Sequence, residues 1–241
     1  MSTPTRRGRA HHWPVLALAL VAVVALAPPA GGQGGGHTRE LALLLTPHVA
    51  MSKPGTQGVA IDVVQPSRPI TGERTALPVL GHATSMQGIV WLEVVLPGRP
   101  NGHTGWIRKR GTEFATTHWR LVIHTASRRV TVYRDNRAVR SFSAIVGKTS
   151  TPTPTGNFFV EESIELGPSD VGAPYALALS ARSTVFQEFA GGPGQIALHG
   201  LENVGGTLGT AVSHGCVRLA NDAMRWLATR IGPGVPVTIM S

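Results

Sequence analysis

Residues 195–219 read QIALHGLENVGGTLGTAVSHGCVRL, and the interpretation of the whole chain starts from this stretch. The short apolar run Ile196-Ala197-Leu198 predicts a strand that ends at His199-Gly200. A glycine-containing loop from Glu202 to Val212 then leads to Ser213-His214-Gly215-Cys216. A loop of this length can bring the ends of two neighbouring strands together, and it can therefore place His199 beside Cys216.

The sequence on either side of this stretch predicts a mostly β domain over residues 117–241, with short helices. Strands are predicted from apolar and polar alternation at residues 119–125, 129–134, 139–146, 157–161, 196–198 and 235–240, with a further strand and a helical turn within 176–189. Asp135-Asn136 predicts a turn, and Pro152 and Pro154 keep residues 149–156 in an extended loop. Asn221 is expected to cap a helix that ends near Ile231.

The N-terminus predicts export. Three arginines and no acid precede the wholly apolar run VLALALVAVVALA, Val15 to Ala27, which suits a signal-peptide core and is short for a bilayer span. We interpret residues 1–30 as a signal peptide and residues 31–40 as a glycine-rich linker. An uncleaved N-terminal anchor is the alternative. The chain is then expected at the extracellular or periplasmic face, in the cell wall.

The formal net charge of +9 stays positive without the arginines of the leader. An exported basic chain can be held by anionic cell-wall polymers. Nucleic acid is not expected as a partner, because of the export signal and because the basic residues are scattered without a dense stripe.

Cys216 is the only cysteine in the chain, so it cannot form an internal disulfide. Outside the cell such a cysteine is a reactive thiol, an intermolecular partner or a buried passenger. A nucleophilic cysteine needs a base that takes its proton and amides that stabilise an oxyanion. Gly215 permits a tight backbone beside Cys216, and His199 and His214 both offer a base. Positions two apart share a face of extended chain, so spacing alone leaves open which histidine serves Cys216.

A family resemblance distinguishes the two histidines. Leu198-His199-Gly200, followed by Val212 to Leu219, resembles the signature of L,D-transpeptidases of the YkuD type, in which a histidine and a spacer precede Ser/Thr-His-Gly-Cys. The stretches VGKTSTPTPTGNF (146–158) and PYALALSARS (174–183) are similar to segments of the same domains. Two positions depart from the family pattern: many relatives have threonine in place of Leu201, and some have asparagine in place of Arg218.

The resemblance implies a role for each site residue. Cys216 is the nucleophile and His199 transfers the proton, oriented by the Gly200 carbonyl. Backbone amides at Gly215 and Cys216 form the oxyanion hole, and Ser213 and His214 support the loop. Arg218 is expected to meet a substrate carboxylate or to form a structural ion pair, and Tyr175 to line the cleft or to join the core. No metal or other cofactor is expected.

The resemblance also implies a reaction in peptidoglycan biosynthesis, and with it a role in cell-wall biogenesis and cell shape. Cys216 would take an acyl group from a stem tetrapeptide and pass it to the side-chain amine of a diamino acid in a second stem, which makes a 3→3 crosslink. With water as acceptor the same site is an L,D-carboxypeptidase, and with a protein amine it anchors a protein to the wall. Carbapenems are expected to acylate Cys216.

The sequence also allows three other functional hypotheses. His199, His214 and Cys216 could form a zinc site of a hydrolase, although no HExxH motif or paired cysteines accompany them. An NlpC/P60-type cysteine peptidase usually has aspartate before its cysteine, where this chain has Gly215. A wall-binding protein with a vestigial catalytic domain conflicts with the presence of the nucleophile and both histidines.

Residues 41–111 are predicted to form a small β module of their own. Strands are expected at residues 59–64, 75–80, 89–96 and 104–107. The string WLEVVLPGRPNGHTGWI (91–107) resembles the last hairpin of bacterial SH3-like modules, which implies either a binding module for cell-wall peptides or a structural spacer.

Overall fold

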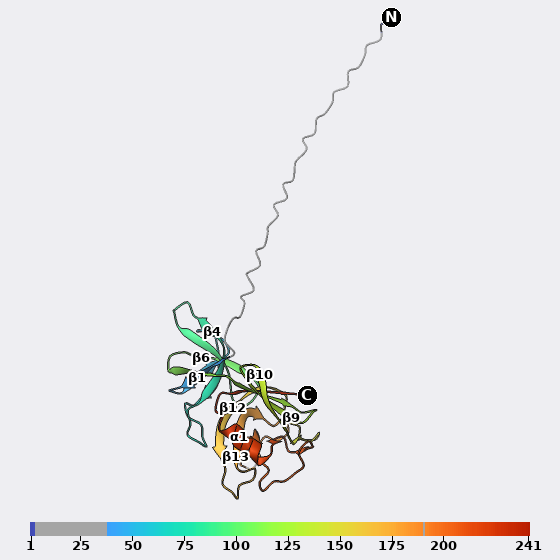
Figure 1. Ribbon diagram of the computed structural model, residues 1–241. Coiled ribbons are helices and arrows are strands. Elements are labelled where there is room, and N and C mark those ends of the chain that lie inside the picture. Colours follow the sequence, from blue (N-terminus) through green and yellow to red (C-terminus); the bar gives the residue numbers. More distant parts are fainter. Residues whose placement is uncertain (3–37, 190) are drawn as a thin grey trace. The chain divides into compact units, whose positions relative to one another are not determined.

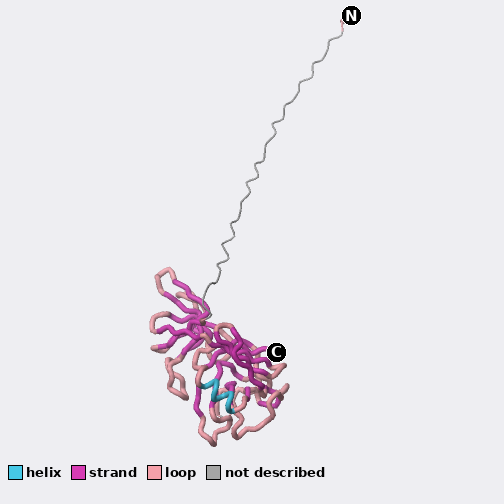
Figure 2. The backbone as a smooth tube through the Cα atoms, viewed as in Figure 1, coloured by secondary structure: helices cyan, strands magenta, loops and turns pink. Residues whose placement is uncertain are grey.

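The structure is a computed structural model, and it describes residues 1–2, 38–189 and 191–241 (Figure 1). The apolar core of the expected leader, and residues 31–37 of the expected linker, lie outside the described residues. No helix in the described part is long and apolar enough to cross a membrane. Strands dominate the described residues, with a single α-helix among them (Figure 2).

Residues 39–117 form an antiparallel sheet, here called the N-terminal module. Its strands are β1 (Arg39–Leu44), β2 (His48–Met51), β3 (Ala60–Val64), β4 (Ala76–Thr84), β5 (Val90–Val95), β6 (Thr104–Arg108) and β7 (Thr112–Thr117). Their order across the sheet is β3-β2-β6-β5-β4-β1-β7. The four predicted strands are present, while β1, β2 and β7 had not been predicted. β1 begins inside the expected linker and pairs with both β4 and β7.

The second sheet belongs to the catalytic domain predicted at residues 117–241. Its strands are β8 (Trp119–His124), β9 (Arg129–Arg134), β10 (Arg137–Ser143), β12 (Gly156–Glu165), β13 (Tyr175–Arg182), β14 (Gln195–His199), β16 (Val217–Arg218) and β17 (Pro236–Met240). Their order is β10-β9-β8-β17-β12-β13-β14-β16, and β11 (Val146–Gly147) pairs separately with β15 (Ala211–Ser213). The predicted mostly β fold is confirmed.

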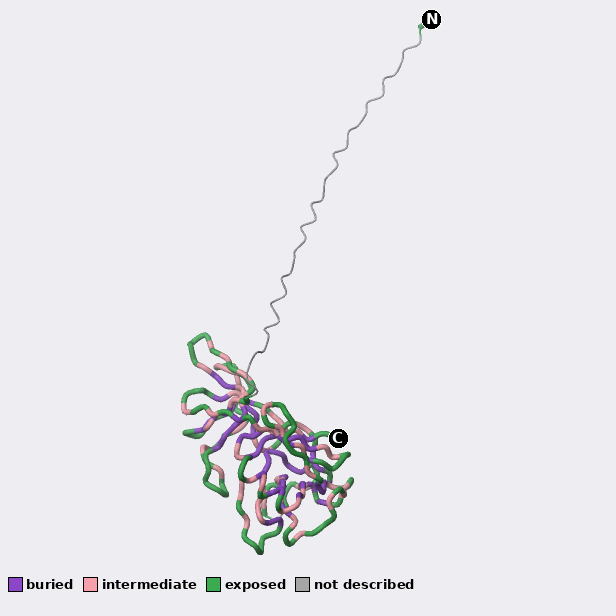
Figure 3. Tube along the Cα trace, in the orientation of Figure 1, coloured by how far each residue is buried: buried purple, intermediate pink, exposed green. Residues whose placement is uncertain are grey.

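Strand β12 lies between two hydrophobic cores because its side chains alternate. Phe158 packs with the apolar side chains of β8, β9, β13 and α1 (Asn221–Ala228). Its neighbour Phe159 is 1% exposed and packs in the core of the N-terminal module. Buried stretches run through both sheets in Figure 3. Strand β12 therefore contributes side chains to the core of the N-terminal module and to the core of the catalytic sheet.

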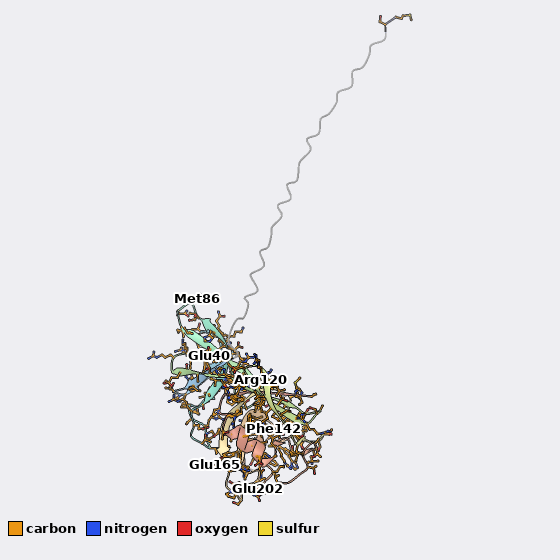
Figure 4. The ribbon with its side chains drawn as sticks, viewed as in Figure 1. Glu40, Met86, Arg120, Phe142, Glu165 and Glu202 are labelled. Atoms are coloured by element: carbon orange, nitrogen blue, oxygen red, sulfur yellow. The ribbon has the colours of Figure 1, made fainter. Side chains whose placement is uncertain are left out.

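Helix α1 is shorter than predicted and is capped differently. It ends at Ala228, and its N-cap residue is Ala220, which makes no side-chain capping bond. The Asn221 side chain turns outward instead, where its Oδ1 accepts the Leu201 amide at 2.8 Å and its Nδ2 donates to Glu202 at 2.8 Å. The predicted cap was wrong because a contact with a distant loop uses the Asn221 amide group. Both Glu202 and Phe142, whose ring lies 5.8 Å from that of Trp226 on α1, are labelled in Figure 4.

Two other local predictions needed correction, and one turn is confirmed. The strand expected at 139–146 ends at Ser143, and Val146 begins β11. Residues 183–189 contain no helix, so the helical turn predicted within 176–189 is wrong. Asp135 and Asn136 join β9 to β10 with φ of 51° and 61°, as a tight hairpin turn requires.

Candidate active site

Two parallel strands bring Cys216 and His199 together. Strand β16 pairs with β14 so that Leu198 lies opposite Val217 and His199 lies opposite Arg218. Cys216 directly precedes β16, and the Ala197 backbone forms a hydrogen bond with its thiol. The loop between His199 and Cys216 therefore joins the ends of neighbouring strands, as its length predicted.

One hydrogen bond determines the tautomer of His199. Its Nδ1 lies 2.8 Å from the carbonyl oxygen of Gly200. A carbonyl only accepts, so Nδ1 carries the proton and donates it. In the neutral ring Nε2 is then bare, and it can accept a proton from a thiol. The Gly200 carbonyl thus fixes the orientation of the imidazole.

Two glycines make room for the imidazole and for the turn that follows it. A Cβ on Gly172 would lie 2.4 Å from His199 Nδ1, and a Cβ on Gly200 would lie 2.0 Å from the carbonyl oxygen of Ala173. The Gly200 amide donates to the Gly172 carbonyl at 2.7 Å. The loop before β13 is thereby fixed against His199. The sequence analysis missed Gly172, which stands just before the stretch that carried the resemblance.

The loop before Cys216 is closed by hydroxyl groups. Ser213 is fully buried, and its Oγ donates to the Cys216 carbonyl at 2.6 Å and accepts the Gly215 amide at 3.2 Å. These two bonds fix the backbone turn from Ser213 to Cys216. The second bond also gives a partner to the Gly215 amide, one of the two amides predicted to face an oxyanion, which leaves the Cys216 amide as the candidate donor.

The proline-containing loop at residues 149–156 holds the same segment from outside. Thr151 Oγ1 donates to the Ser213 carbonyl at 3.0 Å, and Thr153 Oγ1 donates to the Gly215 carbonyl at 2.8 Å. Thr153 Oγ1 also accepts the Gly147 amide at 2.9 Å. Sequence analysis recognised this loop without assigning the two threonines. The alternation of Thr and Pro could have indicated these bonds. The prolines restrict the backbone of the loop, and the threonine hydroxyls can then bond to another segment.

Arg218 places a cation beside the pair. Its Nη1 donates to the Gly205 carbonyl at 3.3 Å, and its buried Nε has no partner among the described residues. No carboxylate in the described part of the chain forms an ion pair with it, so the structural ion pair considered for Arg218 is not formed there. Its positive charge lowers the pKa of both His199 and Cys216.

The side chains of His214 and Tyr175 contact other aromatic and apolar residues. The exposed His214 ring stacks on Phe189 at 5.9 Å between ring centres and lies 6.1 Å from Phe186. Tyr175 is half-buried and packs against the catalytic core. The His214 ring therefore packs on the segment after β13, and Tyr175 packs against the catalytic core.

Burial moves the pKa of the two central groups in opposite directions. It raises the pKa of Cys216 from 9.0, although a hydrogen bond from Ala197 and the charge of Arg218 act against it. It lowers the pKa of His199 from 6.5, against the effect of the Gly200 carbonyl. For the thiol, desolvation outweighs the favourable contacts with Ala197 and Arg218. Both shifts favour the neutral form of the group.

Comparison with known domains identifies the family. Residues 118–239 match the family model YkuD, the L,D-transpeptidase catalytic domain. The chain belongs to the YkuD family. The match spans β8 to β17, which includes every site residue described above.

Relatives of the YkuD-family chain agree with this result. YkuD of Bacillus subtilis (strain 168) is 27% identical over 146 residues, which are 61% of this chain and 73% of the relative. YkuD of Bacillus licheniformis is 28% identical over 124 residues, 52% of this chain and 67% of the relative.

Solved structures of L,D-transpeptidases are more distantly similar to this YkuD-family chain. An L,D-transpeptidase from Mycobacterium smegmatis has a TM-score of 0.39 at 18% identity, with 64% of this chain and 91% of that chain covered. L,D-transpeptidase 3 from Mycobacterium tuberculosis, in complex with a faropenem-derived adduct, has a TM-score of 0.43 at 16% identity and covers 68% and 94%.

The zinc reading does not fit the geometry of this YkuD-family site. Among the described residues, no three His, Cys, Asp or Glu side chains are grouped so that they could hold a metal ion. His214 packs on phenylalanine rings instead of completing a set with His199 and Cys216.

A cleft of about 730 Å³ lies on the N-terminal module, lined by Trp91, Arg108 and Arg110 among others, and contains neither Cys216 nor His199.

Proposed function

We propose that this YkuD-family enzyme is an exported peptidoglycan L,D-transpeptidase that forms 3→3 crosslinks through a thioester on Cys216. The observation that carries the proposal is the bond from His199 Nδ1 to the Gly200 carbonyl, which leaves Nε2 as a proton acceptor on the strand next to Cys216. Family membership supplies the reaction class, and the substrate and the exported location are part of the proposal.

Acylation begins from the neutral pair. His199 Nε2 takes the thiol proton as Cys216 Sγ attacks the carbonyl carbon of the third stem residue, a diamino acid. The Cys216 amide donates to the oxyanion that develops on the carbonyl oxygen. The tetrahedral intermediate collapses with cleavage of the bond to the terminal D-alanine, and the imidazolium returns the proton to the departing amine.

Deacylation reverses the roles. The side-chain amine of a second stem attacks the thioester carbonyl, and His199 accepts a proton from it. The C–S bond breaks, the new amide forms the 3→3 crosslink, and the proton returns to Cys216. Arg218 supports binding in both steps, because its cation lacks a carboxylate partner in the described chain and can meet a carboxylate of the stem peptides.

Mass spectrometry of the purified protein with a disaccharide tetrapeptide tests the proposal. We expect an acyl adduct on Cys216 and the release of crosslinked dimers. Tripeptide alone would mean that water is the acceptor, and the enzyme would then be an L,D-carboxypeptidase. Dimers made by a Cys216→Ala protein would refute the mechanism.

Two further expectations belong to the same proposal. Carbapenems should acylate Cys216, since their strained β-lactam carbonyl offers the same target to the thiol, and a stable mass increase on the wild-type protein and none on Cys216→Ala would support this. Export rests on the arginines and the apolar run of the leader, and N-terminal sequencing of the protein recovered from a cell-wall fraction tests it. An intact leader would mean an anchored enzyme.

A further inference from the structure

The segment Ser183–Phe189, which follows β13, forms an aromatic contact with the loop of Cys216. Phe186 and Phe189 lie 5.5 Å apart between ring centres, and both contact the ring of His214. His214 is two residues before Cys216. These three rings are here called the aromatic cluster. The backbone connects His214 of this cluster to Cys216, the proposed nucleophile.

The segment has little burial to hold it in place. Phe189 is 49% exposed and Val185 is 48% exposed. Its hydrogen bonds are few. Ser183 Oγ accepts the amides of Val185 and Phe186, and the Ser183 amide donates to the Gly194 carbonyl. Phe189 exchanges two backbone hydrogen bonds with Gly192. Because so little of the segment is buried, hydrophobic packing alone would leave the position of the aromatic cluster poorly determined.

Arg99 of the N-terminal module holds the segment from outside. Its Nη2 donates to the carbonyls of Ser183 and Phe186, both at 2.9 Å, and its Nη1 donates to the carbonyl of Pro193 at 2.9 Å. One planar guanidinium thus joins both ends of the excursion between β13 and β14. Hydrogen bonds from a charged donor are about twice as strong as neutral ones.

The chain around Arg99 and Gly194 is built for this contact. Asn101 bonds the backbone of Arg182 twice, at 2.7 and 2.8 Å, which fixes the loop between β5 and β6 at the end of β13. A Cβ on Gly194 would lie 2.2 Å from the Phe186 carbonyl oxygen and 3.2 Å from Arg99 Nη2. Only glycine leaves room for the Phe186 carbonyl to turn toward the guanidinium.

We infer that Arg99 is a positioning residue for the reaction: it holds Phe186 and Phe189 against His214 and so shapes the side of the Cys216 site where a stem peptide enters. The part that concerns the stem peptide rests on the proposed function. The N-terminal module accordingly contributes to the active site and is more than a spacer.

The test uses the full chain with Arg99→Ala and Arg99→Lys. Thr71→Ala is the matched control, because Thr71 also joins the module to the catalytic domain, through Glu162, without touching the aromatic cluster. The first readout is the NMR chemical shift of the His214 ring protons. The ring current of the stacked Phe189 changes this shift. The second is the KM and kcat for the disaccharide tetrapeptide, and thermal unfolding checks that each variant is folded.

For Arg99→Ala we expect loss of the His214 ring-current shift and a rise in KM of about tenfold with kcat nearly unchanged, since three charge-assisted bonds are lost. Arg99→Lys, which cannot reach three carbonyls from one plane, should fall between. Thr71→Ala should match the wild type in both readouts.

An unchanged His214 shift in folded Arg99→Ala or Arg99→Lys would overturn the inference, as would equal changes in Thr71→Ala. If the wild-type protein did not turn over the tetrapeptide, the proposed function would fail, and the His214 shift alone would then decide whether Arg99 positions the cluster.

Discussion

His199 and Cys216 lie on neighbouring strands, and burial is the main influence on the pKa of each. The same desolvation that keeps both groups neutral removes competing water from the proton transfer between them. Under the proposed mechanism, attack by Cys216 and proton uptake by His199 would belong to one step, in which the orientation of the imidazole by Gly200 matters more than a preformed thiolate.

The pH dependence of thiol alkylation tests the neutral pair. The pKa of Cys216 is raised above 9.0, so its rate of alkylation by iodoacetamide should climb about tenfold per pH unit from pH 7 to pH 9. As Cys216 is the only cysteine, intact mass spectrometry reports on it alone. A rate that is level between pH 6 and pH 8 would instead mean a thiolate–imidazolium pair.

Separate exchange of the two histidines tests the assignment of the base. His199→Gln can still donate to the Gly200 carbonyl but cannot take the thiol proton, so acylation of Cys216 should slow by about 10²- to 10⁴-fold. His214→Gln loses ring stacking alone and should slow acylation by less than about tenfold. Timed mass spectrometry of the acyl-enzyme measures both, and a larger loss at His214 would reverse the assignment.

At the level of elements, the loop before β13 controls the position of His199. Gly172→Ala places a methyl group against the imidazole and imposes strain at a φ of +88°. We expect acylation to slow at least about tenfold, because a displaced base costs rate steeply.

Gly209→Ala is the matched control for this change. Its φ is +86° and no atom lies within 4 Å of the added Cβ, so it brings the same backbone strain without a contact to His199. The two variants are compared by acylation rate and by urea unfolding. Equal loss of rate in both would assign the effect to backbone strain instead of to the imidazole.

In the whole described chain, an ion-pair cluster joins the module to the catalytic sheet at β12. Glu161 is buried and forms ion pairs with Arg68 of the module and with Arg182 of β13. Desolvation lowers the pKa of Arg182 to about 10, which leaves it charged at neutral pH. The module and the catalytic sheet are therefore expected to unfold together.

Glu161→Gln tests this coupling. It leaves Arg182 without its carboxylate and Arg68 with only Glu162, 3.9 Å away, so the free energy of unfolding should fall by about 3–5 kcal/mol. Glu113→Gln removes the carboxylate of an exposed pair with Arg74 and should cost less than about 1 kcal/mol. Urea unfolding followed by both fluorescence and circular dichroism measures the two. Similar small losses would mean that the Glu161 cluster adds little to stability.

Local sequence was enough for features that depend on near neighbours. The alternation in residues 129–134 predicted β9, since period-2 burial is a property of a single strand. The Asp135-Asn136 turn and the extended proline loop follow from backbone preferences of those residues. The motif from His199 to Cys216 gave the family, although spacing alone left His199 and His214 equivalent.

Other features required the folded chain, because they depend on residues far apart in sequence. Pairing of β14 with β16 brings His199 to Cys216. Pairing of β17 with β8 joins the first three strands of the catalytic domain to the rest of its sheet. Three other features form only when distant loops meet. They are the contacts that the Asn221 side chain makes instead of a cap on α1, the space for His199 at Gly172, and the hydrogen bonds from Arg99 to the segment with the aromatic cluster. Burial depends on the whole core, and so the direction of the Cys216 pKa could not be predicted from the histidines beside it.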